Sequence, residues 1–273
     1  MNASEDSRAD GYESFYREFD SPLMQQVRRE GYGEDIGQHS WVGAEELRGD
    51  IPRLRLAAAS RLLDLGCGPC GPLTFILASV GCFGMGVDLS PSALATGRVR
   101  AEALGISNLL SVREADLSEQ LPFESRSFDA AMALDVVLHV PDRMGLFQEV
   151  ARLLCRGGRF LFTDGGVLAG SISSEEVRER SAHGYTQFAA PGWNQKLVES
   201  AGFRLIETEN RTGSMLNNAR GRLAAIRTHR LELEQVLGVA GFSRQERYLK
   251  TVVGLSLRGA VSRLMYLAEL VAA

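Results

Sequence analysis

Residues 61–71, RLLDLGCGPCG, constrain the fold of this chain more than any other stretch. A short apolar run, interrupted only by Asp64, leads into a loop that contains Gly66, Gly68 and Gly71, and an apolar helical run follows. Strand, glycine loop and helix in this order form the first half of a nucleotide-binding βαβ unit. Glycine permits positive φ and close approach of a ligand, while the helix N-terminus offers unpaired N–H groups. The stretch therefore predicts a site for a negatively charged or hydroxyl-rich small molecule.

Three further apolar runs follow, and an acidic residue lies at or near the end of each. Asp88 ends the second run, Asp116 follows the third, and Asp135 ends the fourth. Asp88 stands about 24 residues after Asp64, close to the spacing of the ribose-binding acid in dinucleotide folds. Parallel strands end at one edge of their sheet, and ligands of α/β proteins bind there. We therefore expect these acids to share one rim.

The alternation of apolar runs and helical periodicity predicts an α/β fold, with a mostly parallel sheet and helices on both faces. Strands are expected at 61–65, 83–87, 109–113, 128–133, 158–163, 203–209 and 262–270. Helices are expected at 45–56, with Pro52 as a potential break, and at 72–80, 91–104, 143–154, 175 onward, 194–200 and across 211–258. A loop is expected from Gly165 to Ser174. The long helical segment between the last two strands suits a lid or an acceptor pocket.

Composition narrows the class of partner. The chain has 273 residues, which suits one α/β domain with an elaboration, and its net charge is −4. This acidic balance disfavours nucleic acid and acidic membranes as partners. No apolar run reaches the 18 or so residues that span a bilayer. The first residues are polar and lack the apolar core of a signal peptide, so we expect a cytoplasmic location. Oligomeric state stays open, a homo-oligomer included.

Cys67 and Cys70 form a C-x-x-C pair inside the glycine loop. Such a pair can bind a metal or exchange a disulfide. No second pair with zinc-like spacing accompanies it, and Cys82 and Cys155 are the only other cysteines. We therefore expect no metal here, and interpret the two thiols as small side chains that fit a tight loop.

The whole motif series resembles one family. The segments LDLGCGPCG, GVDLS, READL, FDAAMALDVVLHVPD and LLCRGGRFLFTD, across roughly residues 58–165, are similar to the motifs of class I S-adenosylmethionine-dependent methyltransferases. The glycine loop alone also fits the GxGxxG of dinucleotide oxidoreductases, and Asp116 and the segment 135–139 favour the methyltransferases. The resemblance implies a Rossmann-like methyltransferase fold, with a seven-stranded, mostly parallel sheet and an antiparallel last strand. It also implies an N-terminal helical cap at 1–57 and a domain at 58–273 with acceptor-side segments at 165–200 and 211–258.

The resemblance implies S-adenosylmethionine as cofactor and S-adenosylhomocysteine as product. Asp64 would orient loop amides or meet the methionine ammonium, Asp88 would bind the ribose hydroxyls, and Asp116 would accept the adenine amine. The cofactor-binding residues would be Asp64, Gly66, Cys67, Gly68, Gly71, Asp88, Leu89, Ala115, Asp116, Leu117, Leu134 and Asp135.

The loop from Tyr32 to Trp41 resembles a cap in one branch of the family. Residues 33–36, GEDI, are similar to a segment that covers the cofactor in sarcosine/dimethylglycine and phosphoethanolamine N-methyltransferases. By this resemblance Tyr32, Gln38 and Trp41 are candidates for contact with the cofactor.

His139 follows Asp135 by four residues, as in the Asp-x-x-x-His of phosphoethanolamine methyltransferases. Its pKa range suits a general base, although a histidine at this rim could equally be a hydrogen-bonding residue without a catalytic role. In the resembling enzymes an N-terminal tyrosine pairs with the histidine. Tyr16 is the candidate for that second catalytic residue, unless Phe19 takes its place.

The acceptor pocket is expected to include His139, Tyr185, Phe188 and Trp193 together with the segment 211–258. Aromatic faces could hold a cationic amine or shape an apolar pocket. In the helical segment, Arg220 is a candidate for binding an anionic acceptor, as part of a set that is equally consistent with a solvated surface: Arg220, Arg222, Arg227, His229 and Arg230.

The sequence thus predicts an enzyme that transfers a methyl group from S-adenosylmethionine to a small molecule. An amine nitrogen is the first choice of acceptor, because the resemblance is to the sarcosine/dimethylglycine-like group. That group includes enzymes of secondary metabolism, so carbon or oxygen of a terpenoid, indole or polyketide-like acceptor is the second choice. A cofactor-binding module without catalysis is the third.

Overall fold

The computed structural model describes residues 16, 18–181 and 184–271 and contains a seven-stranded sheet. The strands are β1 (Arg61–Leu65), β2 (Phe83–Asp88), β3 (Leu110–Glu114), β4 (Phe128–Leu134), β5 (Leu154–Leu168), β6 (Phe203–Asn210) and β7 (Val261–Leu270). Their order across the sheet is β3-β2-β1-β4-β5-β7-β6. β7 pairs antiparallel with both neighbours, and the other pairs are parallel, which confirms the predicted sheet.

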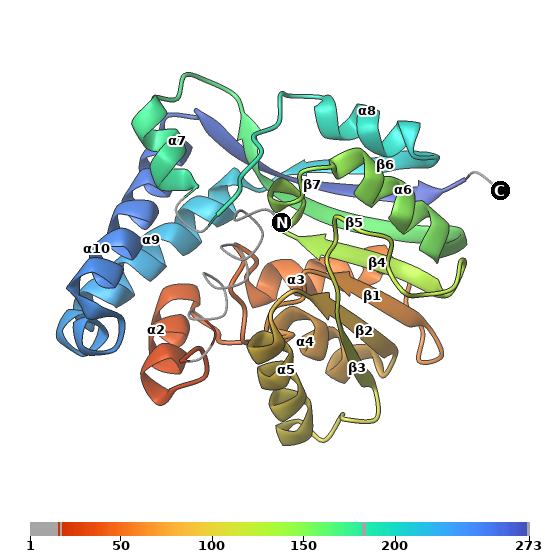
Figure 1. Ribbon diagram of the computed structural model, residues 1–273, viewed down its shortest axis with the longest axis horizontal. Helices are drawn as coiled ribbons and strands as arrows, with labels where there is room; N and C mark the ends of the chain where they lie inside the picture. The colour runs from red at the N-terminus through yellow and green to blue at the C-terminus, as the bar shows by residue number, and fades with distance from the viewer. Residues whose placement is uncertain (1–15, 17, 182–183, 272–273) are drawn as a thin grey trace, which may run out of the picture.

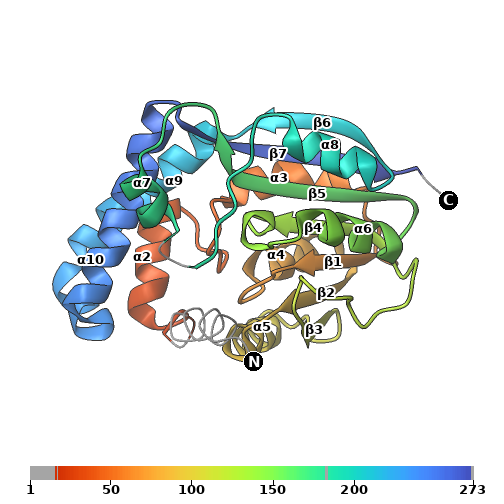
Figure 2. The ribbon, with the colours of Figure 1, turned by 45° about the horizontal axis from the view of Figure 1, so that its top comes forward.

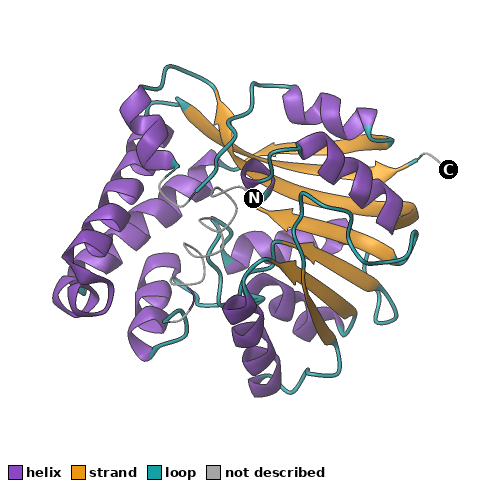
Figure 3. Ribbon diagram, viewed as in Figure 1, coloured by secondary structure: helices purple, strands orange, loops and turns teal. Residues whose placement is uncertain are grey.

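Helices cover both faces of this sheet, as Figure 3 shows. The described α-helices are α2 (Pro22–Tyr32), α3 (Ala44–Asp50), α4 (Gly71–Val80), α5 (Pro91–Ala103), α6 (Arg143–Leu153), α7 (Ser174–Arg180), α8 (Trp193–Ser200), α9 (Thr212–Thr228) and α10 (Arg230–Leu257). Two short 3₁₀ helices, η1 (Ile51–Leu54) and η2 (Val137–His139), complete the described elements. The core clusters assign α6 and α8 to one face and α3, α4 and α5 to the other.

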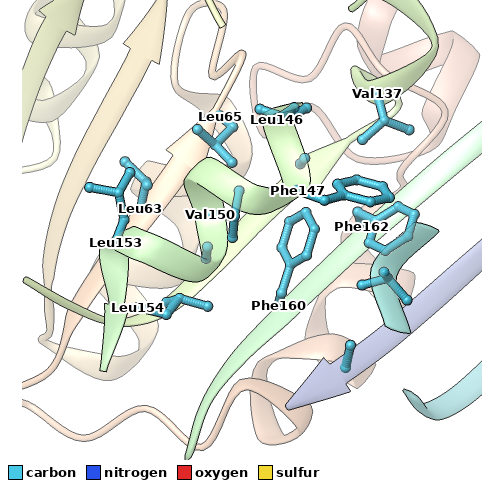
Figure 4. Close-up of a cluster of buried hydrophobic side chains, with 14 of the residues drawn as sticks. Leu63, Leu65, Val137, Leu146, Phe147, Val150, Leu153, Leu154, Phe160 and Phe162 are labelled. Atoms are coloured by element: carbon cyan, nitrogen blue, oxygen red, sulfur yellow. The ribbon is translucent and has the colours of Figure 1, made fainter. Parts of the chain in front are cut away.

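Alternation along each strand divides the core into two layers. Leu63 of β1 packs in the layer of α6, whereas the adjacent Leu62 packs in the layer of α4. Figure 4 shows the α6 layer, where Phe147 meets Phe160 and Phe162 with ring centroids 5.7 and 4.9 Å apart. These rings are fully buried. Successive side chains of a strand point to opposite faces, so a continuous apolar run is what a doubly covered parallel strand requires.

Local capping sets several helix starts. Ser90 accepts a hydrogen bond from the backbone N–H of Ala93 in front of α5, whose first residue is a proline. Ser173 and Glu176 form a capping box at the start of α7. Both starts lie just beyond a strand of the sheet, so the caps determine where the chain turns away from the rim.

Two expectations about element ends need correction. The helix expected at 45–56 ends at Asp50 and continues only as η1, because Pro52 lacks the N–H that an α-helix needs. The loop expected from Gly165 begins only after Leu168, since Val167 and Leu168 still pair with β7. β5 is therefore longer than its apolar run.

The helices α2, α7, α9 and α10 form a group beside the carboxyl ends of the parallel strands (Figures 1 and 2). α2 packs against α9, and α9 packs against α10. Met24, Met215 and Phe242 belong to their shared buried cluster, which extends to Val261 at the start of β7. The helical segment between the last two strands is confirmed by α9 and α10. Residues 1–15 and 17 of the cap expected at 1–57 lie outside the described residues.

Among the described helices, none combines the length and the apolar character that crossing a membrane requires.

Candidate active site

The glycine loop leaves β1 in a conformation that requires glycine. Gly66 has φ of 68° and Gly68 of 51°. A Cβ at Gly66 would stand 2.6 Å from Val136, and one at Gly68 would stand 3.0 Å from the hydroxyl oxygen of Tyr16. The N–H groups of Gly66 and Cys67 both donate to the carbonyl of Val87, at 2.7 and 3.0 Å. The loop is therefore bound to the end of β2. It lines a cavity at this edge of the sheet.

Two carboxylates lie beside this loop. Asp88 accepts hydrogen bonds from the N–H of Gly68 at 2.8 Å and of Ser90 at 3.0 Å, one on each oxygen. Asp64 is only 3% exposed. Burial raises the pKa of Asp64 well above its usual value, and the charge of Asp88 adds to this shift; burial also raises the pKa of Asp88 itself. A ligand that brings hydroxyl donors or positive charge would stabilise both carboxylates.

Asp116 and Leu117 form a third part of the rim, just after β3. The side chain of Asp116 accepts a hydrogen bond from the N–H of Ser118 at 2.8 Å, and Leu117 is buried beside it. Both residues line the same cavity as the glycine loop. The arrangement presents one carboxylate and one apolar side chain to a flat ligand.

Asp135 connects four segments of the chain. It follows β4 with a φ of 59°, a left-handed conformation that is uncommon outside glycine. One carboxylate oxygen accepts from the hydroxyl of Thr163 in β5 at 2.9 Å and from Nε of Arg263 in β7 at 2.8 Å. The other accepts from the N–H of Trp41 at 2.9 Å. Although Asp135 lines the cavity, its side chain chiefly binds the loop before α3 to the sheet.

His139 ends η2 and lines the cavity. Its Nδ1 lies 2.8 Å from the carbonyl oxygen of Tyr185. A carbonyl only accepts, so Nδ1 carries a proton and Nε2 holds the lone pair of the neutral ring. Burial lowers the pKa of His139 below its usual value of 6.5, and the charge of Arg180 acts in the same direction. The imidazole is therefore neutral at pH 7 and suited to accept a proton.

A second histidine and a tyrosine lie at the same cavity. The hydroxyl of Tyr16 is 3.5 Å from Nδ1 of His39, and the two rings meet edge to face with centroids 5.9 Å apart. Phe19 contacts both rings. Tyr16 and His39 line the cavity together with His139. The structure thus places the imidazoles of His39 and His139 and the phenol of Tyr16 around one space.

The helical group and Trp41, in the loop before α3, provide the remaining wall. The rings of Trp41 and Tyr248 stack at 6.1 Å with 19° between their planes. Arg180 of α7 donates to the hydroxyl of Tyr248 at 2.8 Å, and Arg222 of α9 lies 4.9 Å from the ring centroid of Trp41. All four residues line the cavity, so this wall combines flat aromatic surface with two guanidinium groups.

Comparison with known proteins agrees with this geometry. Residues 63–162 match the model of a methyltransferase domain family. Phosphoethanolamine N-methyltransferase 1 of Zea mays is 28% identical over 217 residues, which are 80% of this chain and 42% of that protein. Sarcosine/dimethylglycine N-methyltransferase of Halorhodospira halochloris is 31% identical over 142 residues, 48% of this chain and 50% of that one.

Residues 63–162 of this chain are thus a methyltransferase domain, and the chain is similar to class I S-adenosylmethionine-dependent methyltransferases. It is related to the phosphoethanolamine and sarcosine/dimethylglycine N-methyltransferases. A solved geranyl diphosphate C-methyltransferase from Streptomyces coelicolor A3(2) shares its fold, with a TM-score of 0.76, 18% identity and 99% of each chain covered. The chain spans about half the length, or less, of the curated relatives that it matches first.

The structure brings most of the predicted site residues to one cavity. These are Tyr16, Trp41, Asp64, Gly66, Cys67, Gly68, Asp88, Leu89, Asp116, Leu117, Leu134, Asp135, His139 and Tyr185. They come from segments up to 169 residues apart in the chain, from Tyr16 to Tyr185. Their convergence follows from the common edge at which parallel strands end.

Other predicted residues lie outside the lining, each for a local reason. Tyr32 donates to the carbonyl of Ser40 at 2.7 Å, and Gln38 hydrogen-bonds within its own loop. Both side chains therefore hold the conformation of this loop and are not part of the cavity lining. Gly71 must lack a side chain because the backbone of Gly37 packs against it. A Cβ on residue 71 would lie within 2.3 Å of the carbonyl carbon and oxygen of Gly37. Ala115 packs against the α6 layer of the core.

The predicted acceptor residues beyond Tyr185 also lie elsewhere. Trp193 starts α8, where Arg143 packs 4.9 Å from the centroid of its ring. Phe188 is half-buried near the strand β5 and does not line the cavity, and Arg220 is exposed on α9.

Sequence reasoning missed several lining residues, among them His39, Ser40, Ser90, Val136, Arg180 and Tyr248, and did not single out Arg222 from its neighbours. Ser90 carries a usable signal, because it follows Asp88 and caps α5. His39 lies next to the predicted Gln38 and Trp41. Nothing local marks Arg180 or Tyr248, whose positions depend on how the helical group packs.

The cysteine pair has no metal-like environment. The Sγ atoms of Cys67 and Cys70 are 3.6 Å apart, and both thiols are buried. Across residues 16, 18–181 and 184–271, no three His, Cys, Asp or Glu side chains are arranged to hold a metal ion. Burial raises the pKa of Cys67 well above its usual value, which keeps its thiol protonated.

Proposed function

We propose that this chain transfers the methyl group of S-adenosylmethionine to a small-molecule acceptor inside the cavity. The observation that carries the proposal is the convergence of the glycine loop, the strand-end carboxylates and a neutral His139 on one space. The residues fit the cofactor. No described residue donates a hydrogen bond to Asp64, whose buried carboxylate would be matched by an ammonium group. Vicinal hydroxyls would match the two oxygens of Asp88.

In this proposal each rim residue holds one part of the cofactor. Asp88 accepts from the ribose hydroxyls while it keeps the N–H of Gly68 in place. Asp116 accepts from the adenine amine, and Leu117 lies against the ring. Gly66, Cys67 and Gly68 allow the ligand to lie against the backbone of the loop. Trp41, bound to Asp135, closes the cavity from the side of the cap.

When bound, the cofactor supplies a sulfonium methyl group that needs no further activation, so much of the acceleration comes from positioning. His139 takes a proton from the acceptor on Nε2, because its Nδ1–H is held by the carbonyl of Tyr185. Tyr16 and His39 lie at the same cavity and position the acceptor. The cap and the helical group exclude water.

An amine nitrogen remains our first choice of acceptor, supported by the relationship to N-methyltransferases and by the neutral His139. Methylation of carbon or oxygen is the second choice, supported by the shared fold of a geranyl diphosphate C-methyltransferase. A module that binds the cofactor without catalysis is the third.

Methyl-labelled cofactor tests the proposal against a panel of small amines, alcohols and carbon nucleophiles. Label recovered on nitrogen supports the first choice. Label on carbon or oxygen would overturn the choice of nitrogen and leave methyl transfer intact. Cofactor binding without transfer to any member of the panel would favour the non-catalytic module.

A further inference from the structure

A buried polar cluster lies beside the segment that contacts His139, outside the cavity lining. Arg143, the first residue of α6, is 1% exposed, and Asp164 of β5 is fully buried. Nη1 of Arg143 donates to the carboxylate of Asp164 at 2.8 Å and to the side-chain carbonyl of Asn194 at 2.6 Å. Asn194 in turn donates to Asp164 at 2.9 Å. The three side chains thus form a closed triangle of hydrogen bonds, which fixes the guanidinium group.

The second terminal nitrogen of Arg143 holds the backbone next to His139. Nη2 donates to the carbonyl of Gln187 at 3.0 Å, and the N–H of Gln187 donates to the carbonyl of Leu138 at 2.7 Å. Two residues earlier, the carbonyl of Tyr185 accepts from Nδ1 of His139 at 2.8 Å. This stretch of the chain forms no helix or strand. Contacts such as those of Gln187 therefore determine where the carbonyl of Tyr185 lies.

Stability alone does not account for the charged cluster. A buried ion pair costs desolvation, and apolar side chains of similar size in its place are often as stabilising or more so. An apolar side chain in place of Arg143 would fill the same space, but it could not donate to the carbonyl of Gln187. What the guanidinium group adds to packing is thus a fixed position for that backbone.

We propose that Arg143 is a positioning residue for methyl transfer and acts through the backbone of Gln187. By fixing this residue it holds the nearby carbonyl of Tyr185, which keeps the proton of His139 on Nδ1. The inference rests on the proposed function, because it explains how Nε2 comes to hold the lone pair that takes the proton of the acceptor. The hydrogen bond of one ring nitrogen sets the state of the other. Without a fixed carbonyl, the proton can lie on either nitrogen of the neutral ring.

The position of the proton on His139 can be observed directly. The chain has four histidines, and long-range proton–nitrogen correlation spectra of protein labelled in its histidine nitrogens distinguish the two neutral forms of each ring. The signal of His139 is the one missing from His139→Gln. Spectra are recorded on the ligand-free protein above pH 6.5, the usual histidine pKa, so that the ring is neutral.

Two variants remove the contact with Gln187. Arg143→Met leaves Asp164 buried without its partner, which costs stability. The double variant Arg143→Met with Asp164→Asn removes both charges, so no uncompensated charge stays buried. Arg152→Met is the matched control: Arg152 lies on the same helix and donates to the backbone carbonyl of Phe123 at 2.9 Å, outside the cavity lining.

The ring of His139 is expected to carry its proton on Nδ1 in the wild type. In both Arg143 variants part or all of the population should carry it on Nε2. Their kcat, measured with the acceptor that the labelled-cofactor panel identifies, should fall about tenfold or more, which is part of what a general base contributes. Their affinity for S-adenosylhomocysteine should be unchanged. Arg152→Met should match the wild type in all three measurements.

A wild-type ring with its proton on Nε2 would overturn the inference. So would a folded Arg143 variant in which either the Nδ1 proton or kcat stays as in the wild type. A merely structural role of Arg143 predicts that outcome in the double variant, where folding is retained and only the contact with Gln187 is lost.

Failure of the proposed function gives a different result. If His139→Gln transfers the methyl group at the wild-type rate, the proposed base is wrong, whatever the spectra show. If His139→Gln is impaired and the Arg143 variants are not, the base stands and only the positioning role is lost. If no acceptor is methylated at all, the proposed function fails, and the spectra alone decide whether Arg143 sets the position of the proton.

Discussion

The function of single residues in this cavity depends on the neighbours that the fold brings to them. His139 is neutral because burial outweighs the carbonyl of Tyr185, and its tautomer follows from that same carbonyl. Asp64 and Asp88 are held where burial disfavours their charge. Perturbed titratable groups in one cavity are typical of functional sites. Two predictions about His139 follow from these environments.

Replacing His139 with glutamine should lower the rate of methyl transfer about a hundredfold or more, because a general base contributes on that scale. Affinity for S-adenosylhomocysteine should not change. Steady-state kinetics and calorimetry measure the two quantities. His229→Gln is the control, since His229 pairs with Glu30 away from the cavity. If His139→Gln transfers the methyl group at an unchanged rate, His139 does not act as a general base.

The pH dependence of kcat/KM should carry the lowered pKa of His139. The neutral ring accepts a proton, so activity should persist below the usual pKa of 6.5 and decline only when the pH falls through the lowered value. His139→Gln should lose this acid limb. A limb that starts above pH 6.5, or one that persists in the variant, would contradict the assignment.

At the scale of elements, buried ion pairs bind α3 and the loop before it to the sheet. Arg263 of β7 is fully buried and joins Asp135, which holds Trp41, to Glu46 of α3 at 2.7 Å. Glu46 also pairs with Arg211, which pairs with Asp50. This network explains why the loop before α3 lies over the cavity. From the sequence, residues 33–36 indicated only a resemblance to a segment that covers the cofactor in related enzymes.

Arg263→Met should destabilise the protein by about 3–5 kcal/mol, because it leaves Asp135 and Glu46 buried without their partner. Denaturant unfolding measures the free energy. Arg204→Met is the control: Arg204 is 62% exposed in its pair with Glu269, and the loss of such a pair costs below about 1 kcal/mol. Equal losses in the two variants would show that the network does not fasten α3 to the sheet.

The sequence predicted elements better than their mutual placement. Continuous apolar runs identified β1, β2 and β4, because strands covered on both faces need them. Arg220 and Arg222 show the limit: they lie about 200° apart around α9, so only one can face the cavity. No amphipathic asymmetry in 211–258 tells which one does. That choice depends on the packing of α9 against α2, which has no local signal.

At the scale of the whole molecule, the strand-end acids and the glycine loop converge because their strands are parallel, whereas the opposite wall of the cavity is built mainly by α7, α9 and α10. The rim could therefore be predicted residue by residue, and Asp64, Asp88 and Asp116 do line one cavity. The opposite wall could not, since Arg180 of α7 and Tyr248 of α10 meet only after these two distant helices pack. Trp193 and Phe188 were assigned to this wall on aromatic composition alone, and neither lines the cavity.

Binding of S-adenosylhomocysteine, measured by calorimetry, tests the central claim most directly. The wild type should bind one equivalent and should not bind NAD. Asp88→Asn should bind about a hundredfold more weakly, since charged hydrogen bonds to the ribose are lost. Asp129→Asn should bind like the wild type, because Asp129 accepts from the N–H of Arg61 at the opposite end of the sheet. Binding of NAD in place of S-adenosylhomocysteine, or equal affinity of Asp88→Asn and wild type, would contradict the account.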